Sequence, residues 1–325
     1  MEKGEVMKTF LRYGVAVAAL CAFTVSAQAT VLIDEQFESG YNRTSVYIAN
    51  SNMAWFKGRS NTSATVNVGS LSFSTSSSSG ASGYWGYFTD PAGSVGSVGS
   101  ASSVTAGHLA LGIGDKLTVS IGFSLGTIPA STSAGALRFG LLDSAAASQV
   151  PDQTRFTVDA NSGPSNGAFI NDPGYGAFLP LTSATALTDQ INLNRRTTFT
   201  SSNLMSTAGD WTSLASVGGA YNPLSSGVNY TFNYSVARLD ASTWELSASI
   251  VDTLSQTVMT SGSAQTASGQ SSFDWIIWRM PAEAVGNPDV FTDLKVEVVA
   301  IPEPSTLVLV GAGLGMLFGM IRRRR

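Results

Sequence analysis

The 325-residue chain is poor in the residues that build most catalytic and metal sites. Its single cysteine, Cys21, lies in the N-terminal leader described below, so the body contains none. A disulfide, a thiolate metal site and a cysteine nucleophile are therefore excluded from the body. The single histidine, His108, excludes a zinc site built from several His and Cys ligands. A Ser-His-Asp triad would have to use His108, for which we predict a structural or exposed role instead.

Charged residues are also scarce, at 12% of the chain, whereas Ser, Thr, Gly and Ala are abundant. This composition is typical of a β-rich extracellular protein with many turns. The predicted leader holds three basic and two acidic residues, and the predicted tail holds four and one. The 18 Lys/Arg and 22 Asp/Glu of the chain therefore leave 11 basic and 19 acidic residues on the body, a net charge of −8. An acidic body with scattered basic residues carries no nucleic-acid footprint.

Residues 1–29 have the pattern of a secretory signal peptide. Lys8 and Arg12 precede an apolar stretch over residues 13–25, and Ala27-Gln28-Ala29 offers a small-x-small cleavage site. We expect export by the Sec machinery and cleavage by signal peptidase before Thr30. Lipid attachment at Cys21 is the alternative, and the residues around Cys21 fit it poorly.

Residues 30–300 are predicted to form an all-β domain. Apolar and polar residues alternate from Lys116 to Leu125, which indicates a strand with one buried face. Two further alternating runs, residues 230–236 and 244–250, flank a turn and predict an antiparallel hairpin. Residues 145–228 look loop-rich, and helical periodicity occurs only in the leader and the tail. About a dozen short strands separated by turn signals predict an antiparallel β-sandwich.

Residues 301–325 form a tail with three parts in a fixed order. Pro302-Glu303-Pro304 cannot continue a strand or a helix and leaves an extended segment. An apolar run over residues 307–321 follows, which as a helix would cover about 22 Å. This is short for a membrane, but local thinning and snorkelling of Arg322–Arg325 permit insertion as a transmembrane helix. The positive-inside rule keeps these arginines (Arg322, Arg323, Arg324 and Arg325) in the cytoplasm.

Two resemblances follow from these residues. The tail resembles the PEP-CTERM sorting signal of Gram-negative bacteria, which implies removal by an exosortase-type membrane protease and release of the body to the cell surface or extracellular matrix. A permanent membrane anchor is the alternative. The strands at residues 34–37, 114–120, 138–141, 230–240 and 291–298 are similar to those of concanavalin A-like and LamG-like jelly rolls, which implies a jelly-roll β-sandwich.

Three sets of body residues are candidates for binding or for the core. Loop aromatics able to stack on a sugar ring of extracellular polysaccharide are Trp55, Tyr84, Trp85, Tyr87, Tyr175 and Trp211. We expect Trp244, Trp275 and Trp278 in the core. Jelly rolls often hold a structural Ca²⁺ near their first and last strands, and the acids in those elements are Asp34, Glu35 and Asp293. Solvated surface acids are the alternative, and no other cofactor is indicated.

The sequence favours a non-enzymatic role, either structural or carbohydrate-binding. The alternative is a carbohydrate-active enzyme, a glycoside hydrolase or lyase, on the same fold. Such an enzyme needs a pair of carboxylates that face each other. Asp34, Glu35 and Glu38 come closest in sequence, but their spacing does not place all three on one face of a strand, so the sequence identifies no catalytic residue.

Overall fold

The structure is a computed structural model, and it describes parts of the chain between Ala29 and Ala300. The described residues are 29–37, 42–43, 47–49, 54–57, 62–75, 82–90, 105–106, 108–126, 136–144, 172–180, 191–197, 210–217, 222–267, 269–280 and 289–300. The predicted leader and the tail that includes Pro302, Glu303, Pro304 and Arg322–Arg325 lie outside them. No helix within the described residues is long and apolar enough to cross a membrane.

Every regular element in these ranges is a strand. The first eleven are β1 (Ala29–Glu35), β2 (Asn42–Arg43), β3 (Tyr47–Ala49), β4 (Ala54–Lys57), β5 (Thr62–Asn67), β6 (Ser70–Thr75), β7 (Ser82–Tyr87), β8 (Thr89–Asp90), β9 (Thr105–Ala106), β10 (Leu109–Ala110) and β11 (Asp115–Ser124). The others are β12 (Ala136–Leu142), β13 (Gly174–Pro180), β14 (Ile191–Arg196), β15 (Trp211–Val217), β16 (Asn229–Arg238), β17 (Trp244–Asp252), β18 (Val258–Thr266), β19 (Ser272–Phe273), β20 (Trp275–Met280) and β21 (Asp289–Ala300).

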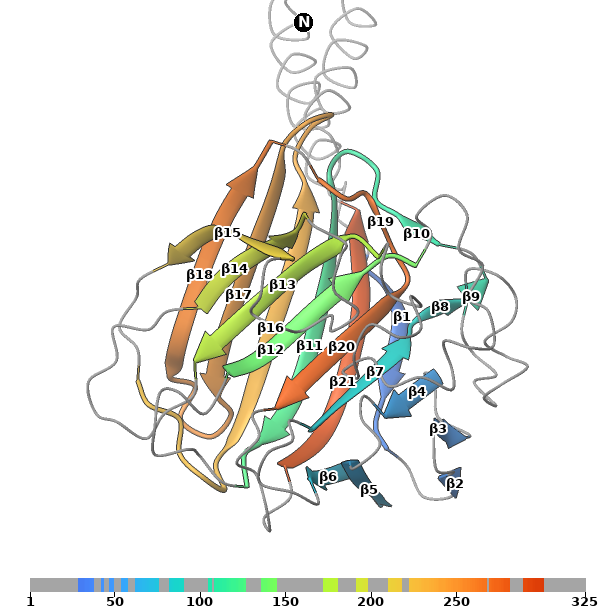
Figure 1. The fold of residues 1–325 in the computed structure, drawn as a ribbon, viewed down its shortest axis with the longest axis vertical. Helices are drawn as coiled ribbons and strands as arrows, with labels where there is room; N and C mark the ends of the chain where they lie inside the picture. The colour runs from blue at the N-terminus through green and yellow to red at the C-terminus, as the bar shows by residue number, and fades with distance from the viewer. Residues whose placement is uncertain are drawn as a thin grey trace, which may run out of the picture.

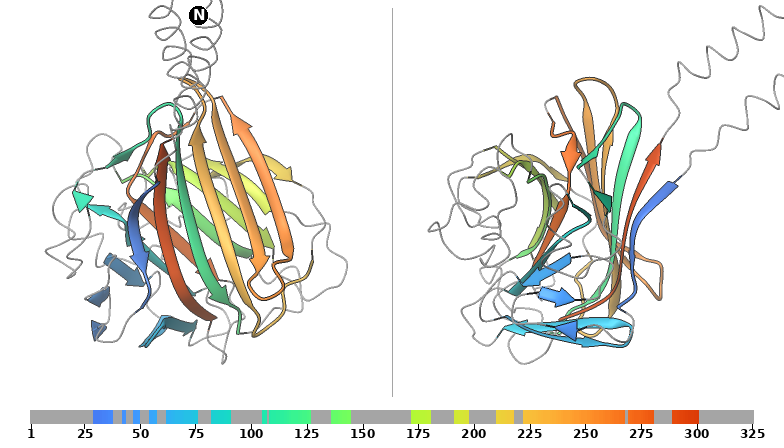
Figure 2. Two further views of the ribbon diagram at one scale, coloured as in Figure 1. Left: turned by 180° about the vertical axis from the view of Figure 1, so that it is seen from behind. Right: turned by 90° about the vertical axis from the view of Figure 1, so that its right-hand side faces the viewer.

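The strands form two large antiparallel sheets that pack face to face (Figures 1 and 2). One sheet has eight strands in the order β18-β17-β16-β11-β21-β6-β5, with β1 also paired to β21. The other has nine strands in the order β15-β14-β13-β12-β20-β7-β4-β3-β2. The predicted all-β antiparallel sandwich is therefore confirmed. The pairs β10–β19 and β8–β9 form two small sheets.

Alternation of apolar and polar residues with a period of two explains why the central strands of the eight-stranded sheet form. In β11 the residues Leu117, Val119 and Ile121 are buried, while the residues between them are half-buried. The predicted hairpin is formed by β16 and β17, and the carboxylate of Asp240 accepts hydrogen bonds of 2.7 Å from two backbone N–H groups in its turn. Local alternation and turn chemistry are thus sufficient to place these strands.

Aromatic rings from the two inner faces form the centre of the core. The Phe139 ring of β12 lies 4.9 Å from the Tyr234 ring and 5.2 Å from the Phe232 ring, both on β16. Trp278 of β20 contacts Phe232 edge-on at 5.2 Å. Trp244, Trp275 and Trp278 are all buried, as expected from the sequence.

Residues 145–228 contain more regular structure than the sequence predicted. β13, β14 and β15 lie in this region and form one edge of the nine-stranded sheet. The loop-rich prediction did not identify these three strands; in β13, two glycines mark close packing within a strand, as discussed below.

The first and last strands are neighbours. Ala29 of β1 pairs with Val299 of β21, so β1 begins at the end of the sandwich where β21 finishes. β21 is also an interior strand, with β11 on one side and β1 and β6 on the other. The two ends of the described chain therefore emerge side by side (Figure 2).

Candidate functional site

Two carboxylates meet where β12 ends and β20 begins. Leu142 of β12 pairs with Trp275 of β20, and the backbone N–H of Asp274 donates a 3.1 Å hydrogen bond to the carbonyl of Leu142. Asp143 directly follows Leu142, and Asp274 directly precedes Trp275. The register of this strand pair therefore brings together two acids that are far apart in the sequence.

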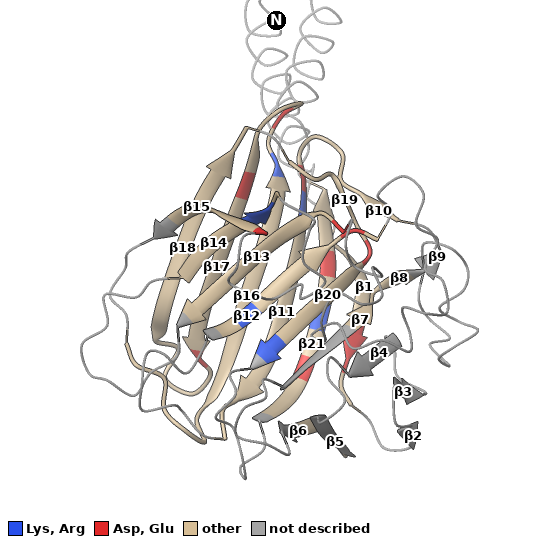
Figure 3. Ribbon diagram, viewed as in Figure 1, with Lys and Arg blue, Asp and Glu red and all other residues tan. Residues whose placement is uncertain are grey.

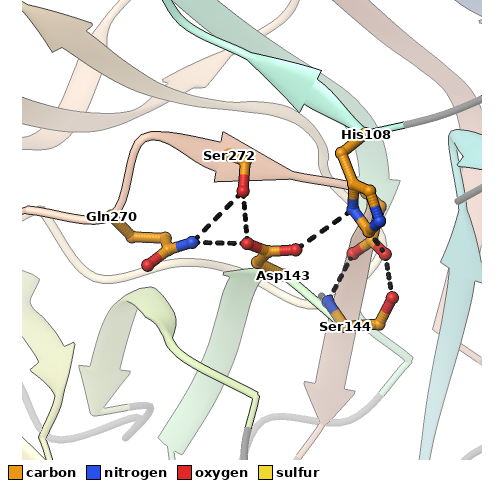
Figure 4. Close-up of polar contacts among 6 residues, drawn as sticks. His108, Asp143, Ser144, Gln270 and Ser272 are labelled. Carbon is orange, nitrogen blue, oxygen red and sulfur yellow. Dashed lines mark hydrogen bonds and ion pairs between the residues drawn. The ribbon is translucent and has the colours of Figure 1, made fainter. Parts of the chain in front are cut away.

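His108 completes this group. It lies just before β10, which pairs with β19, and β19 ends at Phe273 next to Asp274. The Nδ1 atom of His108 lies 3.2 Å from Oδ1 of Asp143 and 3.6 Å from Oδ2 of Asp274 (Figure 4). The imidazole is 29% exposed, whereas the two carboxylates are 3% and 0% exposed. The histidine is thus the solvent-facing member of the group.

Neighbouring donors hold both carboxylates in place. The second oxygen of Asp143 accepts hydrogen bonds from the side-chain amide of Gln270 and the hydroxyl of Ser272, as Figure 4 shows. Asp274 accepts a 2.9 Å bond from the backbone N–H of Ser144 and another bond from its hydroxyl. These contacts resemble the outer shell that orients carboxylate ligands around a metal ion.

Burial sets the electrostatics of the group. Desolvation raises the pKa of the Asp274 carboxyl well above its ordinary value, and the nearby charges of Asp143 and Asp172 raise it further, against the hydrogen bonds from Ser144. An isolated negative charge is therefore unfavourable at Asp274. A bound cation or a proton removes this cost.

The three residues fit a divalent cation. One ligand atom from each of His108, Asp143 and Asp274 lies within 4.8 Å of the other two, and this is the one such group of His, Cys, Asp or Glu among the described residues. An imidazole nitrogen combined with carboxylate oxygens suits several divalent metals. The sequence singled out His108 but neither aspartate.

The same geometry is unfavourable for nucleophilic catalysis. The hydroxyl of Ser144 donates to Asp274 and is not paired with His108, although a Ser-His-Asp triad needs the histidine on the serine. The Asp274 side chain is fully buried, so a substrate cannot reach it. The arrangement is therefore better suited to ion binding than to acid–base chemistry.

The predicted calcium ligands are not brought together. Asp34 and Glu35 are consecutive residues of β1 and so point to opposite faces of the sheet, with Asp34 exposed and Glu35 buried. One oxygen of Glu35 accepts a 2.9 Å bond from the N–H of Phe37. Asp293 accepts a bond of 2.8 Å from the hydroxyl of Thr292. The candidate ion site thus lies at different residues from those that sequence suggested.

The structure also reduces the set of sugar-stacking candidates. Tyr87 and Tyr175 are fully buried, so no sugar ring can stack on them, and the Tyr175 hydroxyl accepts a bond from the backbone of Gln270. Trp211 is half-buried and contacts Phe178 edge-on at 5.2 Å. Trp55 lies in β4 and Tyr84 and Trp85 lie in β7, but their side chains are outside the described set. These three and Trp211 remain candidates.

Among the residues that the structure describes, Lys and Arg do not gather into one patch. Figure 3 shows the Lys and Arg positions of the described residues on several separate strands. The buried guanidinium of Arg138 has its pKa lowered to about 10 by desolvation and by Arg279. Its guanidinium carbon lies 5.2 Å from the Phe178 ring centre, which is a packing role within the sheet.

The PEP-CTERM protein-sorting motif matches residues 300–325. No curated protein sequence matches the chain. Among solved structures, the chain is similar to arcelin-5 of Phaseolus vulgaris (9% identity, 83% of this chain and 98% of that one, TM-score 0.40) and lectin II of Ulex europaeus (12%, 80% and 99%, 0.38). It is also similar to the calcium-bound form of the VIP36 exoplasmic/lumenal domain (11%, 84% and 90%, 0.44). The chain thus carries a PEP-CTERM sorting motif behind a β-sandwich whose structural neighbours are lectin-like, concanavalin A-like jelly rolls.

Proposed function

We propose that this is an exported, non-catalytic protein that an exosortase-type membrane protease sorts to the cell surface or extracellular matrix of a Gram-negative bacterium. Its β-sandwich serves there as a structural or carbohydrate-binding module. The observation that carries the proposal is the sorting motif at residues 300–325. The motif starts at Ala300, the last residue of β21.

The position of the motif suits proteolytic removal. Pro302-Glu303-Pro304 follows β21 almost directly, so a cut at or after this tripeptide leaves every strand of the sandwich intact. A cut inside β21 would remove a strand that pairs with β11 on one side and β1 on the other. Processing at the tripeptide is therefore compatible with a folded product.

The cluster of His108, Asp143 and Asp274 supports a non-catalytic body. A divalent cation bound by these three residues would neutralise the two carboxylates. Ser144, Gln270 and Ser272 keep the carboxylate oxygens in position. The group then ties the start of β10 to the end of β12 and the start of β20, which is a structural role.

A carbohydrate-active enzyme is the second candidate, because Asp274 has a raised pKa beside a second carboxylate, Asp143. Paired carboxyls of this kind act as acid and base in glycoside hydrolysis. Full burial of Asp274 argues against it. Release of reducing sugar from a polysaccharide, lost in Asp143→Asn, would establish the enzyme and refute the non-catalytic proposal.

Intact mass of the exported protein tests the sorting proposal. We expect the wild-type product to lack residues 307–325 and a variant with Pro302, Glu303 and Pro304 all changed to Ala to retain them and stay in the membrane fraction. Val68→Ala, at a surface turn of the body, serves as a control and should be processed like the wild type. A wild-type product that still ends in Arg325 would refute processing and favour a permanent anchor.

A further inference from the structure

The outer face of the eight-stranded sheet carries an unusual set of side chains. In β11, β16 and β17 the residues Val119, Tyr234 and Leu246 are buried against the other sheet. Because side chains alternate along a strand, their immediate neighbours point outward. The left panel of Figure 2 views this sheet from its outer side, with β18, β17, β16 and β11 next to each other.

Short hydroxyl and amide side chains form two rows across these strands. The pairing register aligns the first row, which consists of Thr118, Ser235, Ser247 and Ser263. The second row lies two residues further along each strand and consists of Ser120, Asn233, Ser249 and Ser261. Neighbours within a row are about 4.8 Å apart, and the rows are about 7 Å apart, by the ordinary spacing of sheets. The outer faces of sheets usually carry many long charged residues instead.

These short side chains leave a shallow trough in the sheet. Its volume is about 660 Å³, and its floor consists of residues from both rows together with backbone of β16, β17 and β18. Lys116 lines one end. On the adjacent strand β21, Lys295 and Glu297 form an ion pair of 2.6 Å, so their charges are matched with each other. The trough is therefore polar and its floor is uncharged.

Most of the hydroxyl groups are available to a ligand. Ser235 and Ser247 bond to each other at 2.7 Å. The side chains of Ser249, Ser261 and Ser263 form no hydrogen bond with other described residues, and Ser261 and Ser263 are exposed. Each hydroxyl can both donate and accept.

We propose that this trough, which we call the hydroxyl trough, binds a chain of a neutral extracellular polysaccharide. The inference rests on the proposed function, because it names the ligand class and the surface for the carbohydrate-binding role. Rows of groups that both donate and accept hydrogen bonds match the hydroxyls of successive sugar rings. The uncharged floor matches a ligand without charge.

Other occupants fit less well. A polyanion such as a nucleic acid or a polyuronate needs a basic surface, whereas the body has a net charge of −8 and the trough has one lysine at its end. A second copy of the chain would need an apolar, well-packed interface centre, which Ser and Asn do not supply. A membrane surface would need apolar or basic side chains.

The trough also predicts the size of the ligand. The ring of Tyr234, the aromatic residue in the lining, is buried in the core, so each sugar ring gains only exposed hydrogen bonds that compete with water. Useful affinity then requires several rings bound at once, along the rows. We therefore expect binding to polymers and no competition by monosaccharides.

Affinity electrophoresis of the full-length protein in mild detergent tests this inference. The gels contain hydroxyethylcellulose, dextran or alginate, which are two neutral polymers and one polyuronate. We expect retardation by at least one neutral polymer and none by alginate. Ser249→Ile with Ser261→Ile fills the trough and should weaken the retardation roughly tenfold or more. The matched control, Thr231→Ile with Gln265→Ile, adds the same residues to the same face outside the trough and should bind like the wild type.

The outcomes separate the inference from the proposed function. Equal retardation of the wild type and the filled variant would overturn the hydroxyl trough while leaving carbohydrate binding intact. Loss of binding in Trp211→Ala alone would move the ligand to the other sheet and would also overturn it. A wild type that neither neutral polymer retards would refute both the trough and the carbohydrate-binding role. Melting temperature confirms that each variant is folded.

Discussion

Replacing Asp143 with Asn tests whether the cluster of His108, Asp143 and Asp274 holds a cation. The substitution keeps the shape of the side chain and its contact with Gln270 but removes one of two buried carboxylates. A ligand that binds only the folded state at a hundred times its dissociation constant stabilises that state by about 2.7 kcal/mol. For a body of this size, this free energy corresponds to a rise of roughly 5–10 °C in melting temperature.

The assay is thermal unfolding of the exported protein after removal of metals with EDTA, followed by addition of Ca²⁺, Mn²⁺ or Zn²⁺ in turn. We expect one of these ions to raise the melting temperature of the wild type and to have little effect on Asp143→Asn. Asp252→Asn is the control, because Asp252, the half-buried last residue of β17, lies outside the cluster and accepts backbone hydrogen bonds from the turn that follows it. If none of the ions shifts the wild type, or if Asp143→Asn shifts equally, the cation site does not exist.

Two further predictions concern the sandwich itself. Hydrogen bonds from Ser242 and Thr243 lower the pKa of Asp240 to about 2, so its contribution to stability is present above the unfolded value near 3.9 and is lost as pH falls towards 2. The difference in melting temperature between wild type and Asp240→Asn should therefore shrink between about pH 5 and pH 2, and a difference independent of pH would contradict this cause. Phe139→Ala removes a ring that packs against β16 and should lower the free energy of urea unfolding by about 3–5 kcal/mol. Val68→Ala, at a residue 79% exposed, should change it by less than about 0.5 kcal/mol, and equal effects at the two sites would contradict the proposed core.

Local sequence signals were sufficient to predict the strands in which apolar and polar residues alternate strictly. The predicted strand over residues 116–125 is β11, Asp115–Ser124, and the predicted hairpin is β16–β17. These elements depend on period two and on turn residues, which a single sequence contains. Which strands become neighbours is a long-range property, and local alternation does not encode it.

The candidate cation site depends on which strands become neighbours, and so it could not be predicted from local alternation. Asp143 directly follows one strand and Asp274 directly precedes another, and each alone looks like a polar residue at a strand boundary. Only the register between β12 and β20 brings them together with His108. The signal in the sequence was one acid directly after an apolar strand and a second acid directly before another apolar strand. It identifies candidates but not partners.

Glycines in β13 explain why this segment was mistaken for a loop. A Cβ on Gly174 would lie 2.3 Å from the carbonyl oxygen of Leu141, and one on Gly176 would lie 2.9 Å from the ring of Trp211. These glycines are therefore required by a close backbone approach and a covering ring, not by a turn. Tyr175, between them, points to the opposite face of the strand and is buried in the core, which removed it from the sugar-stacking candidates.

The topology finally relates the body to its tail. β21 is the last strand to leave the cytoplasm in an exported chain, yet it pairs with β11 on one side and with β1 and β6 on the other. The eight-stranded sheet cannot be completed before β21 is available, and pairing of the first strand with the last closes the longest loop in the chain. Residues 302–304 of the sorting motif follow directly on the strand that completes the sheet. A sorting motif at this position thus suits a body that completes its folding beside the membrane.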